Sequence, residues 1–112
     1  MQAFFSTDAA ALNDPMLLPD MRKAVARLRT ALESNERIGI FGDFDTDGIT
    51  GTALLAKALG HLGGRVVPYL PHRVDEGHGL NDQAIRTFRD SDVSLIVTVD
   101  CGTASVDEIA LA

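Results

Sequence analysis

Apolar side chains recur at helical spacing near the start of the chain and gather into short runs further along it. Between residues 21 and 32 they form one stripe, made of Met21, Ala24, Val25, Leu28, Ala31 and Leu32. Spacings of three and four place such residues on one face of a helix, and Asp20 stands where a cap is expected. Residues 1–19, with two prolines, predict a lead-in loop before this amphipathic helix.

Three apolar runs predict short buried strands: residues 37–41, 65–70 and 93–99. Helical patterns lie between them, the second of which is capped by Asn81. Strands that alternate with helices predict an α/β fold, here a three-layer, mostly parallel sheet with a βαβαβ core within residues 20–112. Pro68 cannot donate to a strand ladder, so its strand is expected at an edge, whereas residues 93–99 are expected to form the most deeply buried strand.

The chain has the composition of part of a globular protein. Its 112 residues are 46% hydrophobic and 23% charged, with no apolar run of membrane-spanning length and no signal-peptide start. Cys101 is the single cysteine, so an internal disulfide is excluded and a cytoplasmic setting is expected. A last helix is expected to begin near Ser105 but has no proper end before Ala112. We therefore expect an incomplete domain of a longer protein.

Net charge does not decide the kind of partner. Sixteen acidic residues against ten Lys and Arg give a formal charge of −6, which is unfavourable for binding a phosphate backbone. Two bound divalent cations would leave about −2, because bound ions are often the largest local charges in a site. Nucleic acid therefore remains open as a partner if some of the acids are metal ligands.

Four aspartates follow the ends of two predicted strands. Asp43, Asp45 and Asp47 alternate along a turn after the first strand, and Asp100 follows the third. Ligands bind at the carboxyl ends of strands in such sheets, and converging carboxylates suit Mn²⁺ or Mg²⁺. A turn that caps the next helix accounts for one aspartate, but not for three at a spacing of two with a fourth at another strand end.

Two other kinds of site share part of this pattern. An EF-hand loop opens in the same way, but Leu54 stands where its closing Glu belongs and a strand precedes the loop. A haloacid-dehalogenase-type phosphatase carries Asp-x-Asp-Gly-Thr at a strand end, which would make Asp45 a covalent nucleophile. Ile49 replaces the Thr of that motif. The calcium site is excluded, and the phosphatase stays open as an alternative mechanism.

Three strings, in order along the chain, resemble the motifs of RecJ-type single-stranded-DNA exonucleases in the DHH phosphoesterase superfamily. They are Gly42-Asp43-Phe44-Asp45-Thr46-Asp47-Gly48-Ile49-Thr50, the segment from Pro71-His72-Arg73 to Glu76-Gly77-His78-Gly79-Leu80, and Val99-Asp100-Cys101-Gly102. The resemblance covers nearly the whole chain. It departs from the family at Phe41, where some relatives place a metal-binding His. The Asp-His-His motif of the superfamily would fall beyond Ala112, so the DHH domain is expected to be incomplete.

The resemblance implies a two-metal centre of Mn²⁺ or Mg²⁺ that hydrolyses a phosphodiester. In it, Asp45, Asp47 and Asp100 would be catalytic residues and direct metal ligands, and Asp43 would be a ligand or would orient one. Its other implied residues bind substrate: Arg73 contacts a phosphate, His72 and His78 touch substrate or metal, and Gly77 and Gly79 shape a tight loop. For both glycines, turn formation is an equally good interpretation.

The implied function of the longer protein is 5′-to-3′ exonuclease activity on single-stranded DNA in recombination and repair. Another DHH phosphoesterase, acting on oligonucleotides or cyclic dinucleotides, is the alternative enzyme within the superfamily. A third hypothesis concerns the 112 residues alone. Without the remaining ligands, they would be a catalytically inert fold fragment with weak metal affinity or none.

Overall fold

The computed structural model describes residues 13–112 and divides into two compact units, Met1–Thr30 and Ala31–Ala112. In the first unit, a 3₁₀ helix, η3 (Pro15–Leu17), is capped by Asp14, whose carboxylate accepts a hydrogen bond from the Met16 N–H at 2.9 Å. The predicted lead-in loop therefore contains one short helical turn. Residues 1–12 of that prediction lie outside the described residues.

The predicted amphipathic helix is α1 (Met21–Glu33), which begins in the first unit and ends in the second. Asp20 precedes it with φ 55°, in the left-handed region rather than the extended conformation usual for a cap. Its carbonyl accepts from the Ala24 N–H at 3.0 Å, and its carboxylate pairs with Lys23 Nζ at 2.7 Å. Within residues 13–112, every helix is too short or too polar to span a bilayer.

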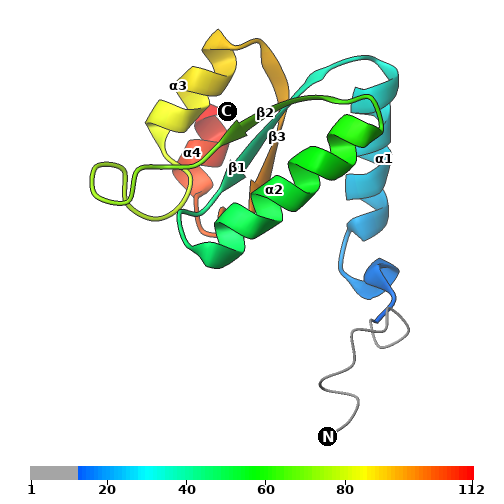
Figure 1. Ribbon diagram of the computed structural model, residues 1–112, viewed down its shortest axis with the longest axis horizontal. Coiled ribbons are helices and arrows are strands. Elements are labelled where there is room, and N and C mark those ends of the chain that lie inside the picture. Colours follow the sequence, from blue (N-terminus) through cyan, green and yellow to red (C-terminus); the bar gives the residue numbers. More distant parts are fainter. Residues whose placement is uncertain (1–12) are drawn as a thin grey trace, which may run out of the picture. The chain divides into compact units, whose positions relative to one another are not determined.

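The second unit is a parallel three-stranded sheet with the order β2-β1-β3 (Figure 1). Its strands are β1 (Arg37–Gly42), β2 (Arg65–Tyr69) and β3 (Val93–Val99). Helix α2 (Thr46–His61) connects β1 to β2, and α3 (Asp82–Asp90) connects β2 to β3. A short last helix, α4 (Val106–Leu111), follows β3. The alternating order and the parallel sheet confirm the predicted α/β fold class.

Alternate residues of β1 face opposite layers. On one face, Phe41 belongs to the core cluster formed with Leu80, Ala84, Ile85 and Phe88. Glycine at 39 is required on this face because a Cβ there would lie 2.9 Å from the Phe88 ring. On the other face, a Cβ at Gly42 would lie 1.9 Å from the hydroxyl of Thr52 in α2. Helices therefore cover both faces of the sheet, and this arrangement confirms the predicted three layers.

The three strands are buried to different extents, and the most buried strand is not the one that the sequence predicted. The most deeply buried strand is β1, where five consecutive residues from Ile38 to Gly42 are buried. The expectation that residues 93–99 would be the most buried is wrong: β3 is only partly covered, because among the described residues it pairs with β1 alone. The edge position predicted from Pro68 is confirmed, since β2 also pairs with β1 alone.

Candidate metal centre

The candidate site lies where the carboxyl ends of β1 and β3 meet. Gly42 and Val99 are register partners at these ends, and the Asp43 N–H continues the ladder by donating to the Val99 carbonyl at 3.3 Å. Asp43 and Asp100 therefore follow adjacent strand ends although they are far apart in the sequence. This pairing confirms the prediction that the aspartate turn and Asp100 lie at the carboxyl ends of neighbouring strands.

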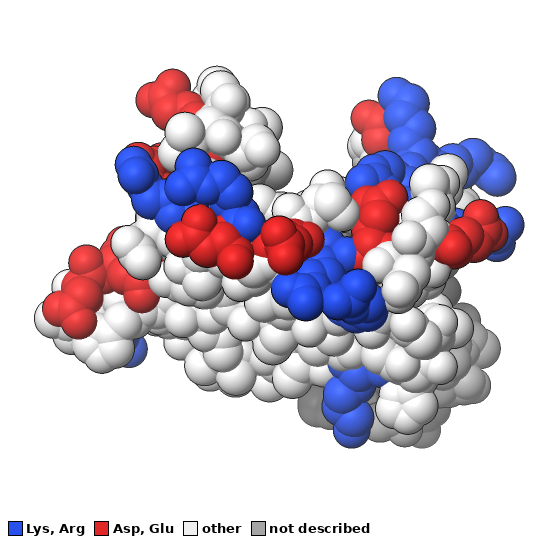
Figure 2. All heavy atoms as spheres, turned by 90° about the horizontal axis from the view of Figure 1, so that it is seen from above, with Lys and Arg blue, Asp and Glu red and all other residues white. Residues whose placement is uncertain are grey.

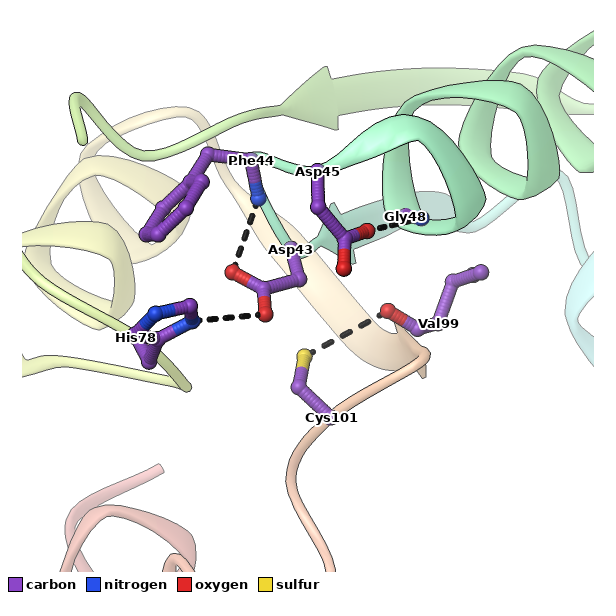
Figure 3. A network of polar contacts seen from close by, with 7 residues as sticks. All are labelled: Asp43, Phe44, Asp45, Gly48, His78, Val99 and Cys101. Carbon is purple, nitrogen blue, oxygen red and sulfur yellow. Dashed lines mark hydrogen bonds and ion pairs between the residues drawn. The ribbon is translucent and has the colours of Figure 1, made fainter.

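Asp43 is the buried member of the group, with 7% of its surface exposed. Its Oδ1 accepts from the Phe44 N–H at 2.8 Å, and its Oδ2 lies 3.0 Å from His78 Nδ1 (Figure 3). The hydrogen bond from His78, assisted by the one from the Phe44 backbone, lowers the pKa of the Asp43 carboxyl against the opposing effect of burial. Asp43 is therefore held as a carboxylate of fixed orientation.

Asp45 and Asp47 lie at the beginning of α2 and are exposed. Asp45 is the cap of this helix, since its Oδ1 accepts from the Gly48 N–H at 2.9 Å, which leaves its second oxygen unengaged by that bond (Figure 3). A Cβ at Gly48 would lie 2.2 Å from the Asp43 carbonyl oxygen. Only glycine therefore lets the helix start this close to Asp43.

Asp100 is exposed and has a backbone φ of 62°, in a region that residues other than glycine adopt rarely. Desolvation by the surrounding protein, followed by the negative charges of the three aspartates of the 43–47 turn, raises the pKa of its carboxyl. A hydrogen bond with Asp45 acts in the same direction. The three aspartates of the turn are thus close enough to Asp100 to oppose its ionisation.

The donor set fits a hard divalent cation. Carboxylate oxygens are the ligands that Mn²⁺ and Mg²⁺ take in proteins, and a cation would relieve the mutual repulsion felt at Asp100. Among residues 13–112, however, no three or more His, Cys, Asp or Glu side chains already gather their ligand atoms around one point. The described residues therefore supply suitable donors without forming a closed metal site by themselves.

Residues 71–80, here called the 71–80 loop, bring two of the predicted substrate residues beside Phe44. The Arg73 guanidinium lies 5.2 Å from the centre of the Phe44 ring, and the His78 ring lies 4.2 Å from it. Because His78 also contacts Asp43, this end of the loop lies against the aspartate turn. The structure thus brings Arg73 and His78 to the edge of the candidate metal centre.

The other three predicted substrate residues have local explanations. His72 is exposed and its Nδ1 lies 2.7 Å from the Asp75 carboxylate of the same loop. Gly77 and Gly79 have φ values of +73° and +85°, which other residues rarely adopt, so turn formation explains both. Their predicted contacts with substrate stay predictions.

Glu76 and Phe44 were missed as organising residues of this region. The Glu76 carboxylate accepts from the Tyr69 hydroxyl at 2.5 Å, from the His72 N–H at 2.7 Å and from Asn81 Nδ2 at 3.2 Å. Both residues lie inside the strings that carry the family resemblance. Their position there was the available signal, since neither residue type indicates such a role alone.

Cys101 packs beside the core cluster, and its thiol donates to the Val99 carbonyl at 3.4 Å (Figure 3). Burial first, and then the negative charge of Asp43, raises the pKa of this thiol. A thiol that stays protonated is a poor nucleophile. Cys101 is thus a packing residue and not a nucleophile.

Comparison with known proteins places this parallel α/β domain with its aspartate-bearing strand ends among the phosphoesterases. Residues 37–112 match the model described as the DHH family, N-terminal domain, and the chain belongs to that family. Membership decides against the haloacid-dehalogenase alternative, in which Asp45 would have been a covalent nucleophile.

Individual relatives show which members of the family this chain is similar to. The chain is 39% identical over 109 residues to the single-stranded-DNA-specific exonuclease RecJ of Bacillus subtilis, covering 97% of this chain and 14% of that protein. It is 47% identical over 95 residues to RecJ of Dickeya dadantii, covering 84% of this chain and 16% of that protein. The chain thus spans only about one-seventh of the curated relatives it matches.

Two solved structures share the fold. One is exonuclease RecJ bound to manganese, with a TM-score of 0.78 and 39% identity over 84% of this chain and 24% of that one. The other is RecJ in complex with Mn²⁺ from Thermus thermophilus, with a TM-score of 0.64 and 38% identity over 83% of this chain and 13% of that one. Both similarities support the arrangement of sheet and helices described above.

Proposed function

We propose that this chain is the amino-terminal part, with residues 20–112 as its α/β core, of a longer metal-dependent phosphodiesterase. Its proposed activity is 5′-to-3′ exonuclease cleavage of single-stranded DNA in recombination and repair, in the cytoplasm. The observation that carries this proposal is the meeting of Asp43 and Asp100 at the paired ends of β1 and β3, with Asp45 in contact with Asp100. The similarity to RecJ exonucleases supports the choice of substrate.

Each aspartate has a proposed role in this chemistry. Asp45, Asp47 and Asp100 are proposed to hold Mn²⁺ or Mg²⁺ as direct ligands, and the bound cation supplies Lewis-acid activation of water and phosphate. Asp43 is the least exposed of the four and is oriented by His78 and the Phe44 N–H, so it is proposed to set the position of the turn. Further ligands are proposed to come from the part of the longer protein outside this chain.

Arg73 is proposed to contact a substrate phosphate. Its guanidinium lies over Phe44, next to the aspartate turn, and a guanidinium offers planar, charge-assisted donors to phosphate. His72, His78, Gly77 and Gly79 are retained as proposed neighbours of the substrate in the same loop. On the face shown in Figure 2, basic side chains of the described residues lie among acidic ones rather than in one continuous patch. Further contacts with DNA are proposed to come from the rest of the longer protein.

The experiment is a nuclease assay on the longer protein with Mn²⁺, using long single-stranded DNA, duplex DNA and dinucleotides. We expect the wild-type protein to degrade the single strand from its 5′ end. Asp45→Asn should lower the cleavage rate by at least about 100-fold, because it removes a metal ligand. Asp90→Asn removes the same charge from the far end of α3 and should keep activity. Cleavage confined to dinucleotides would favour another DHH phosphoesterase, and full activity of Asp45→Asn would contradict the proposed centre.

Metal binding by the 112 residues alone is a separate question. If the aspartates need ligands from outside the chain, calorimetric titration with Mn²⁺ should show weak binding or none, in keeping with the inert-fragment hypothesis. Sub-micromolar affinity that disappears in Asp45→Ala would show that the four aspartates suffice.

A further inference from the structure

Glu76 joins three parts of the second unit through one carboxylate. Its Oε2 accepts from the Tyr69 hydroxyl at 2.5 Å and from Asn81 Nδ2 at 3.2 Å, and its Oε1 accepts from the His72 N–H at 2.7 Å. The Glu76 N–H in turn donates to the His72 carbonyl at 2.9 Å. Bonds to an ionised acceptor are stronger than bonds between neutral groups. This carboxylate therefore fixes the 71–80 loop at both of its ends.

The partners of Glu76 are themselves anchored. Tyr69 is the last residue of β2, and its ring stacks on Phe41 at 5.7 Å and meets the edge of Phe88 at 5.8 Å. Asn81 caps α3, because its Oδ1 accepts from the Ala84 N–H at 2.8 Å while its amide nitrogen is turned toward Glu76. The loop is thus tied at one end to the core and at the other to the start of a helix.

The outer part of the same loop carries the side chains that reach the aspartate turn. Arg73 lies over Phe44, and His78 contacts both Phe44 and Asp43. Both side chains are exposed, and contacts of this kind are individually weak. Their placement therefore depends on the backbone that carries them, and Glu76 is the group that joins the two ends of that backbone.

We propose that Glu76 is a positioning residue of this site, which holds the 71–80 loop so that Arg73 and His78 stand beside Phe44 and Asp43. The inference rests on the proposed function for the role of Arg73 toward phosphate, but not for the geometry of the loop. Glu76 is proposed to touch neither metal nor substrate. It acts through Arg73, and that dependence is what an experiment can detect.

Kinetics of the longer protein test the dependence on Arg73. Glu76→Gln removes the charge while keeping the shape of the side chain. We expect this variant to raise KM for single-stranded DNA about tenfold, which is the effect of one charge-assisted hydrogen bond, and to leave kcat little changed. Asp90→Asn is the matched control. If Glu76 acts through Arg73, the KM rise in the double variant Glu76→Gln/Arg73→Ala is smaller than the product of the two single rises. A rise equal to that product would overturn the proposal.

Nuclear magnetic resonance on the 112-residue chain tests the geometry without any activity. Phe44 should shift the Arg73 Nε–H and His78 ring signals, and Glu76→Gln should move both toward unstructured values while Asp90→Asn leaves them in place. Tyr69→Phe removes one of the three bonds and keeps the aromatic packing, so it should give a smaller shift in the same direction and serves if Glu76→Gln unfolds. Unchanged Arg73 and His78 signals in both variants would overturn the proposal. Failure of the wild-type protein to cleave DNA would contradict only the proposed function.

Discussion

The imidazole of His78 lies 3.0 Å from the carboxylate of Asp43 and joins the 71–80 loop to the end of the central strand. The side chain of His78 is 73% exposed, whereas that of Asp43 is only 10% exposed. An exposed loop residue thus sets the ionisation and orientation of a nearly buried carboxylate. The pair gives the loop and the aspartate turn one shared contact, whose strength can be measured.

Replacing His78 with Phe should raise the pKa of Asp43, because the largest cause of its lowering is removed. A lowered native pKa stabilises the fold above the unfolded value of about 3.9, and the gain is lost as pH falls through the native pKa. We therefore expect His78→Phe to cost about 0.5 kcal/mol in unfolding free energy at neutral pH, a modest figure because solvent screens His78, and almost nothing in strong acid.

Carbon-13 titration of the Asp43 carboxyl and urea unfolding at several pH values would measure both effects. His72→Phe is the matched control, because His72 belongs to the same loop but pairs with Asp75. An Asp43 titration curve that is identical in wild type and His78→Phe would contradict the expected coupling.

The single tyrosine of the chain, Tyr69, should ionise only in strong alkali. Burial, followed by the hydrogen bond to Glu76 and the charge of Glu76, raises its pKa to about 12. Since the native pKa exceeds the unfolded value of about 10, its stabilising effect is complete below pH 10 and is lost as pH rises toward 12. Ultraviolet absorbance of tyrosinate reports this residue alone, and Glu76→Gln should lower the midpoint while burial keeps it above the unfolded value. A wild-type midpoint near the unfolded value would contradict the packing of Tyr69.

Gly48→Ala should be strongly destabilising. The added Cβ would lie 2.2 Å from the carbonyl oxygen and 2.5 Å from the nitrogen of Asp43, and backbone atoms cannot move away as a flexible side chain can. We expect a loss of roughly 2–3 kcal/mol, in the range of overpacking. Gly60→Ala, in the same helix, would place its Cβ more than 4 Å from any neighbouring atom of the described residues and should instead stabilise by about 0.5–1 kcal/mol. Chemical denaturation distinguishes the two, and equal effects would contradict the close approach.

Thr52→Val should stabilise the second unit. The Thr52 side chain is nearly buried, at 3% exposure, and its hydroxyl has no hydrogen-bond partner among residues 13–112. Since an unsatisfied buried polar group costs about 1–3 kcal/mol, Val should gain roughly 1 kcal/mol in urea unfolding. Thr52→Ser keeps the hydroxyl and removes the methyl group, so it should lose stability. A loss with Val would show that the hydroxyl has a partner in solution.

The sequence predicted the fold well because the local signals agreed with one another. Apolar runs, helical stripes and the Asn81 cap predicted the strands and helices, and Pro68 predicted an edge strand. The misjudged burial of residues 93–99 has a physical reason. Apolar character shows that a strand can be buried, but the number of its neighbours decides how much is buried, and β3 has one neighbour among the described residues.

The sequence predicted the charged residues of the candidate site but not the contacts that hold them in place. The spacing of the aspartates and their places after two strands predicted that they would come together. No sequence period predicts that Glu76 accepts three hydrogen bonds, or that Arg73 and His78 meet at Phe44. Such contacts depend on how an irregular loop folds back on a helix cap and a strand end, which is a tertiary property.

The pairing of both outer strands with β1 alone, within residues 13–112, has a consequence for local unfolding. Asp43 and Asp45 are fixed by β1 and α2, whereas Asp100 is fixed by the end of the half-covered β3. Detachment of β3 would carry Asp100 away while β1, α2 and β2 stay paired. Hydrogen exchange should then be faster along β3 than along β1, and a cation bridging Asp100 to the turn would slow it. Metal capture and protection of the third strand would become a single event.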